Sequence, residues 1–576
     1  MTGKLIFCIC LAYFVAAYFI YGGYLGKLFA LNPKSPTPAK TCFDGVDYVP
    51  TPPLVLFGHH FASIAGPGPI VGPIMAAYFG WLPALIWILA GCVFIGAFHD
   101  FAAMVISVRN KGRSISFVME KLMGYAGRQL FLAFCLACLL LIVAIFTILI
   151  AGIFVAHPEV ASASLMFIMM APLFTLATYK YGIRIRYASL VFVPLVFCTV
   201  PLGQLLPCDF AAWGFEGTQV RSIWILILAL YIFCASLLPV QWLLQPRDYL
   251  NSWLLYGMLL LGFAAILFAD TTIEMDSFKG WQAVTADGKV HDVVPNLFIF
   301  VACGACSGFH ALVASGTTSK QIRSEKDIQP IGYGAMLLEG VLGVMALVAV
   351  MTMSPDIFTT AGKNPTAAFA GGLGQLAGQL HLGSMAVNPL WAQNFIALAV
   401  SAFMLTSLDT ATRLGRFLVQ EVFMPKAGEQ AKNGQDEVRG SLGKPHGTLV
   451  TLLGNKYSAS LLMVGLSMIL ALSGEAASIW PIFGASNQLM AALTFLVITL
   501  WLLTRHLNFY LALLPMLFMM VMSLWGIVEV VKVQWGGNLV LVGLGVFLIV
   551  MALLMVALGI SVITHNLRGR ATAVAA

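Results

Sequence analysis

Apolar stretches of about 17–25 residues recur along almost the whole chain, and short polar segments separate them. Each stretch is long enough for a helix to cross a hydrocarbon core of roughly 30 Å. The pattern predicts an all-α polytopic membrane protein with fifteen spans, at about 4–30, 54–80, 82–108, 130–154, 164–180, 187–205, 222–240, 253–269, 296–316, 332–353, 393–411, 458–473, 478–503, 509–530 and 538–563.

One of these stretches is interrupted by glycine and proline. Residues 58–73 read Gly-His-His-Phe-Ala-Ser-Ile-Ala-Gly-Pro-Gly-Pro-Ile-Val-Gly-Pro. The glycines in this run have no side chain and the prolines have no N–H donor, so a regular helix is disfavoured here. Broken helices at membrane depth line cavities and bind cargo in secondary transporters. A proline-kinked packing helix is the alternative. The candidate cargo ligands are His59, His60, Ser63, Gly66 and Gly68, and the carbonyls of Ala65 and Gly66 are candidates for holding a cation.

A second stretch has a similar interruption. Residues 303–310 read Cys-Gly-Ala-Cys-Ser-Gly-Phe-His, in the middle of a predicted span. Small residues that let helices pack closely are the alternative explanation. Two such interruptions in one chain favour a paired cargo site, to which we assign Gly304, Ser307, Gly308 and His310.

Hydroxyl side chains gather in the sequence Leu-Thr-Ser-Leu-Asp-Thr-Ala-Thr-Arg, which ends at Arg413. Thr406, Ser407 and Thr410 carry hard oxygen atoms of the kind that bind a cation. Asp409 either joins this ion site or forms an ion pair with Arg413, four residues further along the helix.

Ionisable side chains also occur inside predicted spans. His99 and Asp100 are adjacent in one of them, and a carboxylate within a membrane is by default a functional candidate. We therefore count both as candidates for ion coupling, with a structural polar network as the alternative. Glu339 and the pair 487–488 (Asn-Gln) are weaker candidates of the same kind.

Charge predicts how the chain is threaded. Of the 31 Lys and Arg residues, 25 fall on one predicted side of the membrane and six on the other. Because cytoplasmic loops collect basic residues, the N-terminus is predicted to be outside and the C-terminus cytoplasmic. Segment 270–295 is expected to form a small outer hairpin, 354–392 an outer lid of two interfacial helices, and 412–457 a cytoplasmic loop.

Single cysteines in a cysteine-free background test this threading. A cysteine at Asp287 should react with an impermeant thiol reagent in intact cells, whereas one at Lys432 should not, because only the first is predicted to face outside. The opposite labelling pattern would overturn the threading.

Composition narrows the classes of function. The chain is 60% hydrophobic with a net charge of +7, and its basic residues lie in short loops, so nucleic-acid binding is not indicated. P-loop, His-Glu-x-x-His and Gly-x-Ser-x-Gly motifs are absent, which argues against ATP-driven transport and familiar enzyme classes. Cys135 and Cys138, like Cys303 and Cys306, have zinc-like spacing but lie in apolar segments. Packing is therefore favoured, and we predict no metal or cofactor.

The order of the spans predicts an inverted repeat. Residues 54–205 and 296–503 would each form five helices, and each set would begin with a broken helix that enters from the opposite side of the membrane. In this scheme, 222–269 is an inserted helix pair, 1–31 an anchor helix and 509–563 a C-terminal helix pair.

At these residues the chain resembles the carbon starvation CstA family. The resembling stretches are 58–66, 243–250 (Leu-Leu-Gln-Pro-Arg-Asp-Tyr-Leu), 303–310, 317–321 (Thr-Thr-Ser-Lys-Gln) and 405–413, and Pro67 departs from the small residue expected there. The resemblance implies a bacterial inner-membrane nutrient transporter induced on starvation, linked to peptide uptake or proton-coupled pyruvate uptake. It also implies the leucine-transporter-type inverted repeat of the amino acid–polyamine–organocation superfamily.

Together these features predict a symporter that uses H⁺ or Na⁺ to import small peptides or a small carboxylate. A membrane-embedded metal or haem enzyme using His59, His60, His99 and His310 is one alternative, and a nutrient sensor that does not transport is another. The histidines in the interruptions are expected to carry protons or contact a carboxylate, whereas His99 is expected to stabilise the fold. The sequence predicts neither the oligomeric state nor the cargo.

Overall fold

The computed structural model describes residues 2–45, 47–238, 242–285, 288–382, 385–422, 454–473 and 476–575. Within these residues, thirteen helices are long and apolar enough to cross a membrane, and one bent helix pair brings the number to fourteen. Helices suit this environment because all their backbone hydrogen bonds can be made within one segment. The prediction of an all-α polytopic membrane protein is confirmed.

Among the described residues, the regular elements of the first half of the chain are helices. Its longer elements are α1 (Gly3–Ala17), α2 (Gly23–Leu28), α4 (Pro53–Ile64), α5 (Gly68–Ala76), α6 (Trp81–Gly91), α7 (Ala97–Arg109), α8 (Ile115–Ala156), α9 (Pro158–Thr175), α10 (Ile185–Leu205), α11 (Gly217–Leu237) and α12 (Leu244–Phe268). Short π-helical turns join α1 to α2 and α6 to α7, so each of these pairs forms one continuous span.

The second half adds two small hairpins. Its elements are β1 (Gln282–Val284), β2 (Val290–Asp292), α13 (Val293–Phe300), α14 (Ala302–Ala305), α15 (Gly308–Gly316), α16 (Ala335–Met351), α17 (Pro355–Ala361), α18 (Pro365–Gly378), β3 (His381–Leu382), β4 (Met385–Ala386), α19 (Pro389–Val422), α22 (Lys456–Ser473), α23 (Ala476–Thr504), α24 (Tyr510–Gln534) and α25 (Leu539–Ala575).

Fourteen of the predicted spans correspond to these thirteen helices and the bent pair α4–α5. The fifteenth, 296–316, is divided among α13, α14 and α15, each too short to cross a membrane alone. The expected loop 109–128 is largely helical, because α8 begins at Ile115 and turns at Gly124, which has a φ of 77°. Helix α19 likewise continues to Val422, beyond the expected end at 411.

The other loop predictions can also be compared with the structure. Strands β1 and β2 pair antiparallel, which confirms the hairpin expected in 270–295. Helices α17 and α18 supply the helix pair expected in 354–392, although its role as an outer lid stays a prediction. Most of the expected loop 412–457 lies outside the described residues.

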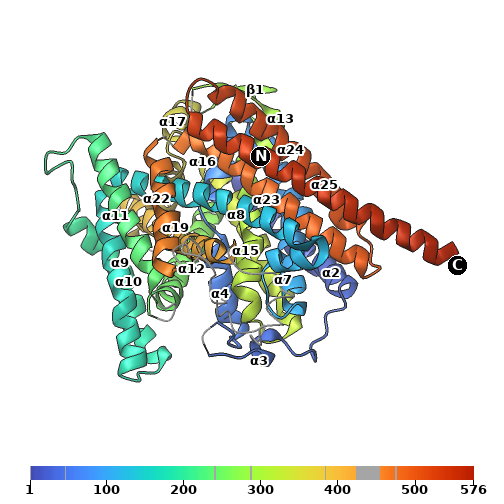
Figure 1. Ribbon diagram of the computed structural model, residues 1–576. Coiled ribbons are helices and arrows are strands. Elements are labelled where there is room, and N and C mark those ends of the chain that lie inside the picture. Colours follow the sequence, from blue (N-terminus) through green and yellow to red (C-terminus); the bar gives the residue numbers. More distant parts are fainter. Residues whose placement is uncertain are drawn as a thin grey trace.

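Helices α8, α15 and α23 occupy the centre of the molecule in Figure 1, with α9, α10 and α11 on one side and α24 and α25 crossing the other. The two broken segments run antiparallel: α4 packs on α15, and α5 packs on α13 and α14. Helix α12 packs on α4 and α19, while α10 packs chiefly on α9. The division into two five-helix repeats with an inserted helix pair stays a prediction.

Candidate functional site

The first interruption is a sharp bend between α4 and α5. The two halves meet at 45°, and Ala65 (φ −70°, ψ 67°) leaves the helical conformation. Pro67 and Pro69 lack N–H groups and so cannot continue the hydrogen bonds of α4. The freed carbonyl of Ser63 accepts a hydrogen bond from Ser407 Oγ at 3.3 Å. The break thus exposes a backbone oxygen of Ser63 to α19, and the expected role of the Ala65 and Gly66 carbonyls stays a prediction.

The second interruption separates α14 from α15. Cys306 (φ −164°, ψ 124°) and Ser307 (φ −122°, ψ 125°) are extended, so nearby N–H groups lose their helical partners. Asn487 of α23 replaces one of them: its Oδ1 accepts from the Phe309 N–H at 3.0 Å, and its Nδ2 lies 3.0 Å from Ser307 Oγ. Asn487, a weaker candidate in the sequence, therefore stabilises the non-helical backbone of the second break.

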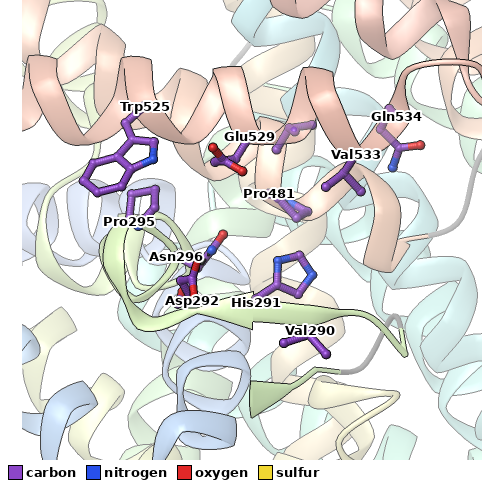
Figure 2. Close-up of a pocket in the computed structure, with 11 residues that line it drawn as sticks. Val290, His291, Asp292, Pro295, Asn296, Pro481, Trp525, Glu529, Val533 and Gln534 are labelled. Carbon is purple, nitrogen blue, oxygen red and sulfur yellow. Dashed lines mark hydrogen bonds between the residues drawn. The ribbon is translucent and has the colours of Figure 1, made fainter. Parts of the chain in front are cut away.

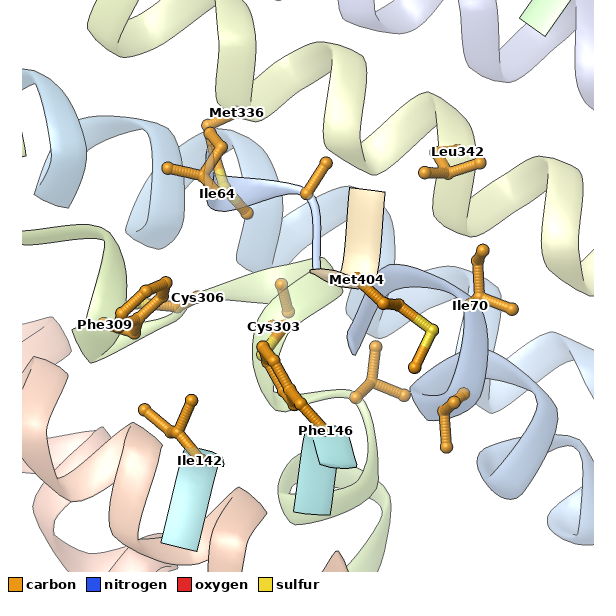
Figure 3. Close-up of a cluster of buried hydrophobic side chains, with 14 of the residues drawn as sticks. Ile64, Ile70, Ile142, Phe146, Cys303, Cys306, Phe309, Met336, Leu342 and Met404 are labelled. Atoms are coloured by element: carbon orange, nitrogen blue, oxygen red, sulfur yellow. The ribbon is translucent and has the colours of Figure 1, made fainter. Parts of the chain in front are cut away.

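The two breaks lie directly against each other. A Cβ added at Gly68 would collide with the side chain of Cys303, and one added at Gly308 would lie 2.5 Å from backbone atoms of α23. Figure 3 shows buried apolar side chains, among them Phe146, Cys306 and Met404, filling the space around the crossing. In this conformation the two glycines permit close helix approach.

A Gly68→Ala variant is therefore expected to lower the thermal stability of the purified protein, because the new methyl group has no room beside Cys303. Gly465→Ala is the matched control, since no atom beyond the neighbouring backbone of α22 lies within 4 Å of the position that its Cβ would take. Equal melting temperatures for the two variants would show that the crossing is looser than the structure describes.

A cluster of ionisable side chains lies immediately beside the second break. Asp100 of α7 contacts His99 Nδ1 through Oδ1 at 2.9 Å and His310 Nδ1 through Oδ2 at 2.8 Å. His310 Nε2 lies 3.4 Å from Glu339 Oε2 of α16. All four side chains are fully buried, and Glu339 has no hydrogen-bond partner among the described residues. The structure therefore joins His99 and Asp100 to His310, which the sequence analysis treated separately.

A second cluster links α4, α11, α12 and α19. Arg247 is fully buried and pairs with Asp409, which also accepts a hydrogen bond from the Tyr231 hydroxyl at 2.8 Å. Asp248 lies 3.3 Å from Arg247 Nη2 and 3.2 Å from Nδ1 of His59. We call these five residues the Arg247 cluster.

The Arg247 cluster changes two interpretations of the sequence. Arg413 donates to the carbonyls of Ala235 and Leu238, so the structure pairs Asp409 with Arg247 and not with its neighbour on α19. The count of basic residues that predicts the threading places Arg247 in a cytoplasmic loop, whereas the structure buries it in α12. Adjacent opposite charges at 247–248, directly before an apolar run, were the signal that could have identified it.

Two of the three predicted ion-coupling hydroxyls, those of Thr406 and Ser407, have hydrogen-bond partners. Thr406 Oγ1 accepts from Asn251 Nδ2 at 3.0 Å, and Ser407 lies 3.5 Å from a Cβ built on Gly66. Thr410 is buried on the same helix. Among the predicted cargo ligands, His60 Nδ1 lies 2.9 Å from Thr318 Oγ1, and Ser63 Oγ donates to the His59 carbonyl at 2.8 Å. Asn251 and Thr318 were not among the predicted site residues.

The cysteine pairs have ordinary partners. Cys303 Sγ lies 3.2 Å from Asn487 Nδ2, and Cys138 Sγ lies 3.6 Å from the Ser486 carbonyl. Within the described part of the chain, no three His, Cys, Asp or Glu side chains are placed to hold a metal ion.

Similar architectures occur among solved structures. The manganese transporter of Eremococcus coleocola, bound to an aromatic bis-isothiourea compound, is 14% identical with a TM-score of 0.42, over 91% of this chain and 99% of that one. MhsT in complex with L-phenylalanine is 13% identical with a TM-score of 0.43, over 88% and 98%. Both TM-scores are low, so the five-plus-five repeat stays a prediction.

Sequence relatives are closer. The peptide transporter CstA of Campylobacter jejuni is 30% identical over 91% of this chain and 80% of its own length. The peptide transporter CstA of Escherichia coli is 31% identical over 89% and 78%, and the pyruvate/proton symporter BtsT of the same species is 30% identical over 89% and 80%. The family model described as carbon starvation protein CstA matches residues 2–366 and 359–526. The chain therefore belongs to the CstA family of multi-pass membrane transporters.

Proposed function

We propose that this protein is a proton-coupled symporter that imports small peptides or a small carboxylate such as pyruvate. The observation that carries the proposal is the buried cluster of His99, Asp100, His310 and Glu339, because it adjoins the second break. Relatives are named as peptide transporters and as a pyruvate/proton symporter, and both kinds of cargo carry a carboxylate.

A proton is the coupling ion that this cluster suits. Its members are carboxylates and imidazoles, whose charge changes by gaining or losing a proton. Because none of them is exposed, an uncompensated change of charge is costly in the low-dielectric interior. Apart from the contact with His310 Nε2 at 3.4 Å, Glu339 has no hydrogen-bond donor among the described residues, so protonation or a movement of α16 would lower the cost of burying its carboxylate. A change of protonation is therefore linked to the positions of α7, α15 and α16.

We place the cargo at the crossing of the two breaks. The N-termini of α5 and α15 begin there and present N–H groups that can face a carboxylate. His59, His60, Ser63, Gly66, Gly68, Gly304, Ser307 and Gly308 are the proposed ligands. Since buried apolar side chains fill this region, cargo would bind when the breaks separate, as alternating access requires.

Sodium coupling is the alternative, and it would use a different place. Ser407 and the Ser63 carbonyl lie together at the first break, with Thr406 and Thr410 on the same helix. Hydroxyl and carbonyl oxygens there would serve Na⁺ as they serve other hard cations. We propose the bacterial inner membrane as the location, with the N-terminus outside and the C-terminus in the cytoplasm.

A binding screen and a transport assay test the proposal. Detergent-purified protein is titrated with di- and tripeptides, pyruvate and lactate, and any ligand found is then tested for uptake into proteoliposomes. We expect one of these classes to bind and to accumulate under an inward proton gradient without Na⁺. Binding without uptake would favour a sensor, and uptake that requires Na⁺ would favour the site at Ser407.

A further inference from the structure

Positive charge is concentrated where α9 leads into α10, in residues 180–187, which we call the basic turn. Figure 1 shows the α9–α10 hairpin at the edge of the molecule. Lys180, Arg184 and Arg186 are all exposed, and the chain has no Asp or Glu between Glu159 and Asp209. Within the described residues none of the three cations forms an ion pair. The basic turn therefore lacks a counter-charge of its own.

Aromatic and apolar side chains accompany this charge. Tyr181, Tyr187 and Trp242 are 73%, 52% and 54% exposed, and Trp242 is held beside the end of α9 because its carbonyl accepts from Thr175 Oγ1 at 3.0 Å. Further along α10, Leu190 is also largely exposed. Tyr and Trp collect at the interface between membrane and water, next to the apolar surface that faces lipid tails. The basic turn therefore lies at the level of the lipid headgroups.

The protein interior behind the basic turn supplies no negative side chain. Ala235 of α11 packs with Ala171 near the end of α9. Here Arg413 donates to the Ala235 carbonyl and Arg416 to the next carbonyl of α11, and neither arginine forms an ion pair within the described part of the chain. The charge of the basic turn is therefore not neutralised from inside.

Charged groups at another surface of the molecule are paired instead. Figure 2 shows a cavity of about 150 Å³ beside the β1–β2 hairpin, with Asp292 and Glu529 among the residues that line it. Asp292 accepts from Gln282 Nε2 at 2.8 Å, and Glu529 lies 3.0 Å from Lys532. Both carboxylates have partners in the chain, so we infer no ligand there. The basic turn differs in this respect.

We propose that the basic turn binds the headgroup of an anionic phospholipid, such as phosphatidylglycerol. A lipid phosphate accepts charge-assisted hydrogen bonds from Lys and Arg, and basic clusters next to a membrane span attract anionic lipids. The acyl chains would lie along the exposed apolar face of α10, and the aromatic rings would flank the headgroup. The predicted threading places the basic turn in the cytoplasmic leaflet.

A bound lipid would act on the Arg247 cluster through α12. Ser189 Oγ of α10 lies 2.7 Å from the Tyr249 hydroxyl, and the rings of Phe174 and Tyr249 are 5.6 Å apart. Tyr249 follows Arg247 and Asp248 directly in the sequence. An anionic lipid that fixes the basic turn therefore also fixes the α9–α10 hairpin against α12. We expect such a lipid to raise the melting temperature of the protein.

Short-chain lipids test the site on the full chain in a neutral detergent. Dioctanoyl-phosphatidylglycerol should bind saturably in isothermal titration, and dioctanoyl-phosphatidylcholine should not. Each basic side chain near a membrane strengthens the attraction about fivefold, so Arg184→Gln should weaken binding about fivefold. The triple variant Lys180→Gln/Arg184→Gln/Arg186→Gln should weaken it roughly a hundredfold and lose the rise in melting temperature.

The matched control is Lys34→Gln/Lys40→Gln/Lys326→Gln, which removes three exposed positive charges from the same predicted side of the membrane. It should bind phosphatidylglycerol as the wild-type protein does. An equal loss in the control would show a general effect of charge and would overturn the site.

Three other results would also overturn the proposal. They are equal binding of phosphatidylcholine, unchanged affinity in both Arg184→Gln and the triple variant, and displacement of the lipid by an equal concentration of inorganic phosphate. The last result would assign the basic turn to free anions. No cargo is present in these titrations, so their outcome does not depend on the proposed function.

Discussion

An Arg247→Gln variant is expected to be destabilised by roughly 3–5 kcal/mol, the usual effect of removing one partner from a buried ion pair. Arg247 is fully buried, and its removal leaves Asp409 and Asp248 without their guanidinium partner. The double variant Arg247→Gln/Asp409→Asn should regain much of this loss. Only Asp248 then remains charged, and it keeps its contact with His59.

This effect is measured by heating the protein in detergent and using size-exclusion chromatography to quantify the folded protein that remains. Lys532→Gln is the control, because its ion pair with Glu529 is exposed and should contribute less than about 1 kcal/mol. A double variant no more stable than Arg247→Gln alone would mean that Asp409 is not the residue that needs this arginine.

The second large effect concerns coupling. Asp100→Asn is expected to abolish cargo accumulation driven by a pH gradient, while exchange of cargo across the membrane continues. Asparagine keeps the shape of the side chain but cannot ionise, so the charge shared with His99 and His310 is lost. Glu339→Gln should act in the same direction, since Glu339 contacts the other side of His310.

Proteoliposomes loaded with unlabelled cargo measure exchange, and empty ones with an imposed pH gradient measure accumulation. His157→Gln is the control, because His157 lies between α8 and α9 and pairs with Glu159, outside the cluster. Normal accumulation by Asp100→Asn would remove this cluster from the coupling mechanism. The hydroxyl site at Ser407 would then be the next candidate.

Local composition was sufficient to predict most of the fold. Apolar length places the spans, because the thickness of the hydrocarbon core fixes the length of a helix that crosses it. Glycine and proline identify the first break and glycine alone the second, since few other residues interrupt a helix so strongly. Span ends at polar residues were less predictable: α8 begins well before 130 because Arg128 is buried in an ion pair with Glu120 at 2.9 Å.

Local composition could not predict contacts between segments that lie far apart in the sequence. His99 and Asp100 lie more than two hundred residues from His310, and nothing in either stretch specifies that α7 packs on α15. The expectation that His99 differs in role from His310 followed from the unbroken helix around His99, in contrast to the break that contains His310. The Arg247 cluster was missed for a related reason, because Arg247 reads as a loop residue until α12 is seen against α4 and α19.

The two glycines at the crossing illustrate a different limit. Sequence shows that Gly68 and Gly308 lack side chains, but it does not show what occupies the vacated space. In the structure Cys303 lies beside Gly68, and the backbone of α23 lies beside Gly308. The same two glycines therefore permit close packing in this conformation. They would line the cargo cavity in a second conformation, in which the breaks have separated.

We propose that each cargo molecule is imported together with a proton, and that the proton passes through the cluster around Asp100 and His310. The most direct measurement uses proteoliposomes that contain a pH-sensitive dye, with cargo added outside in buffer free of Na⁺. We expect cargo to acidify the lumen with the wild-type protein and not with Asp100→Asn. Uptake of cargo with no change in luminal pH, or with an absolute requirement for Na⁺, would contradict it.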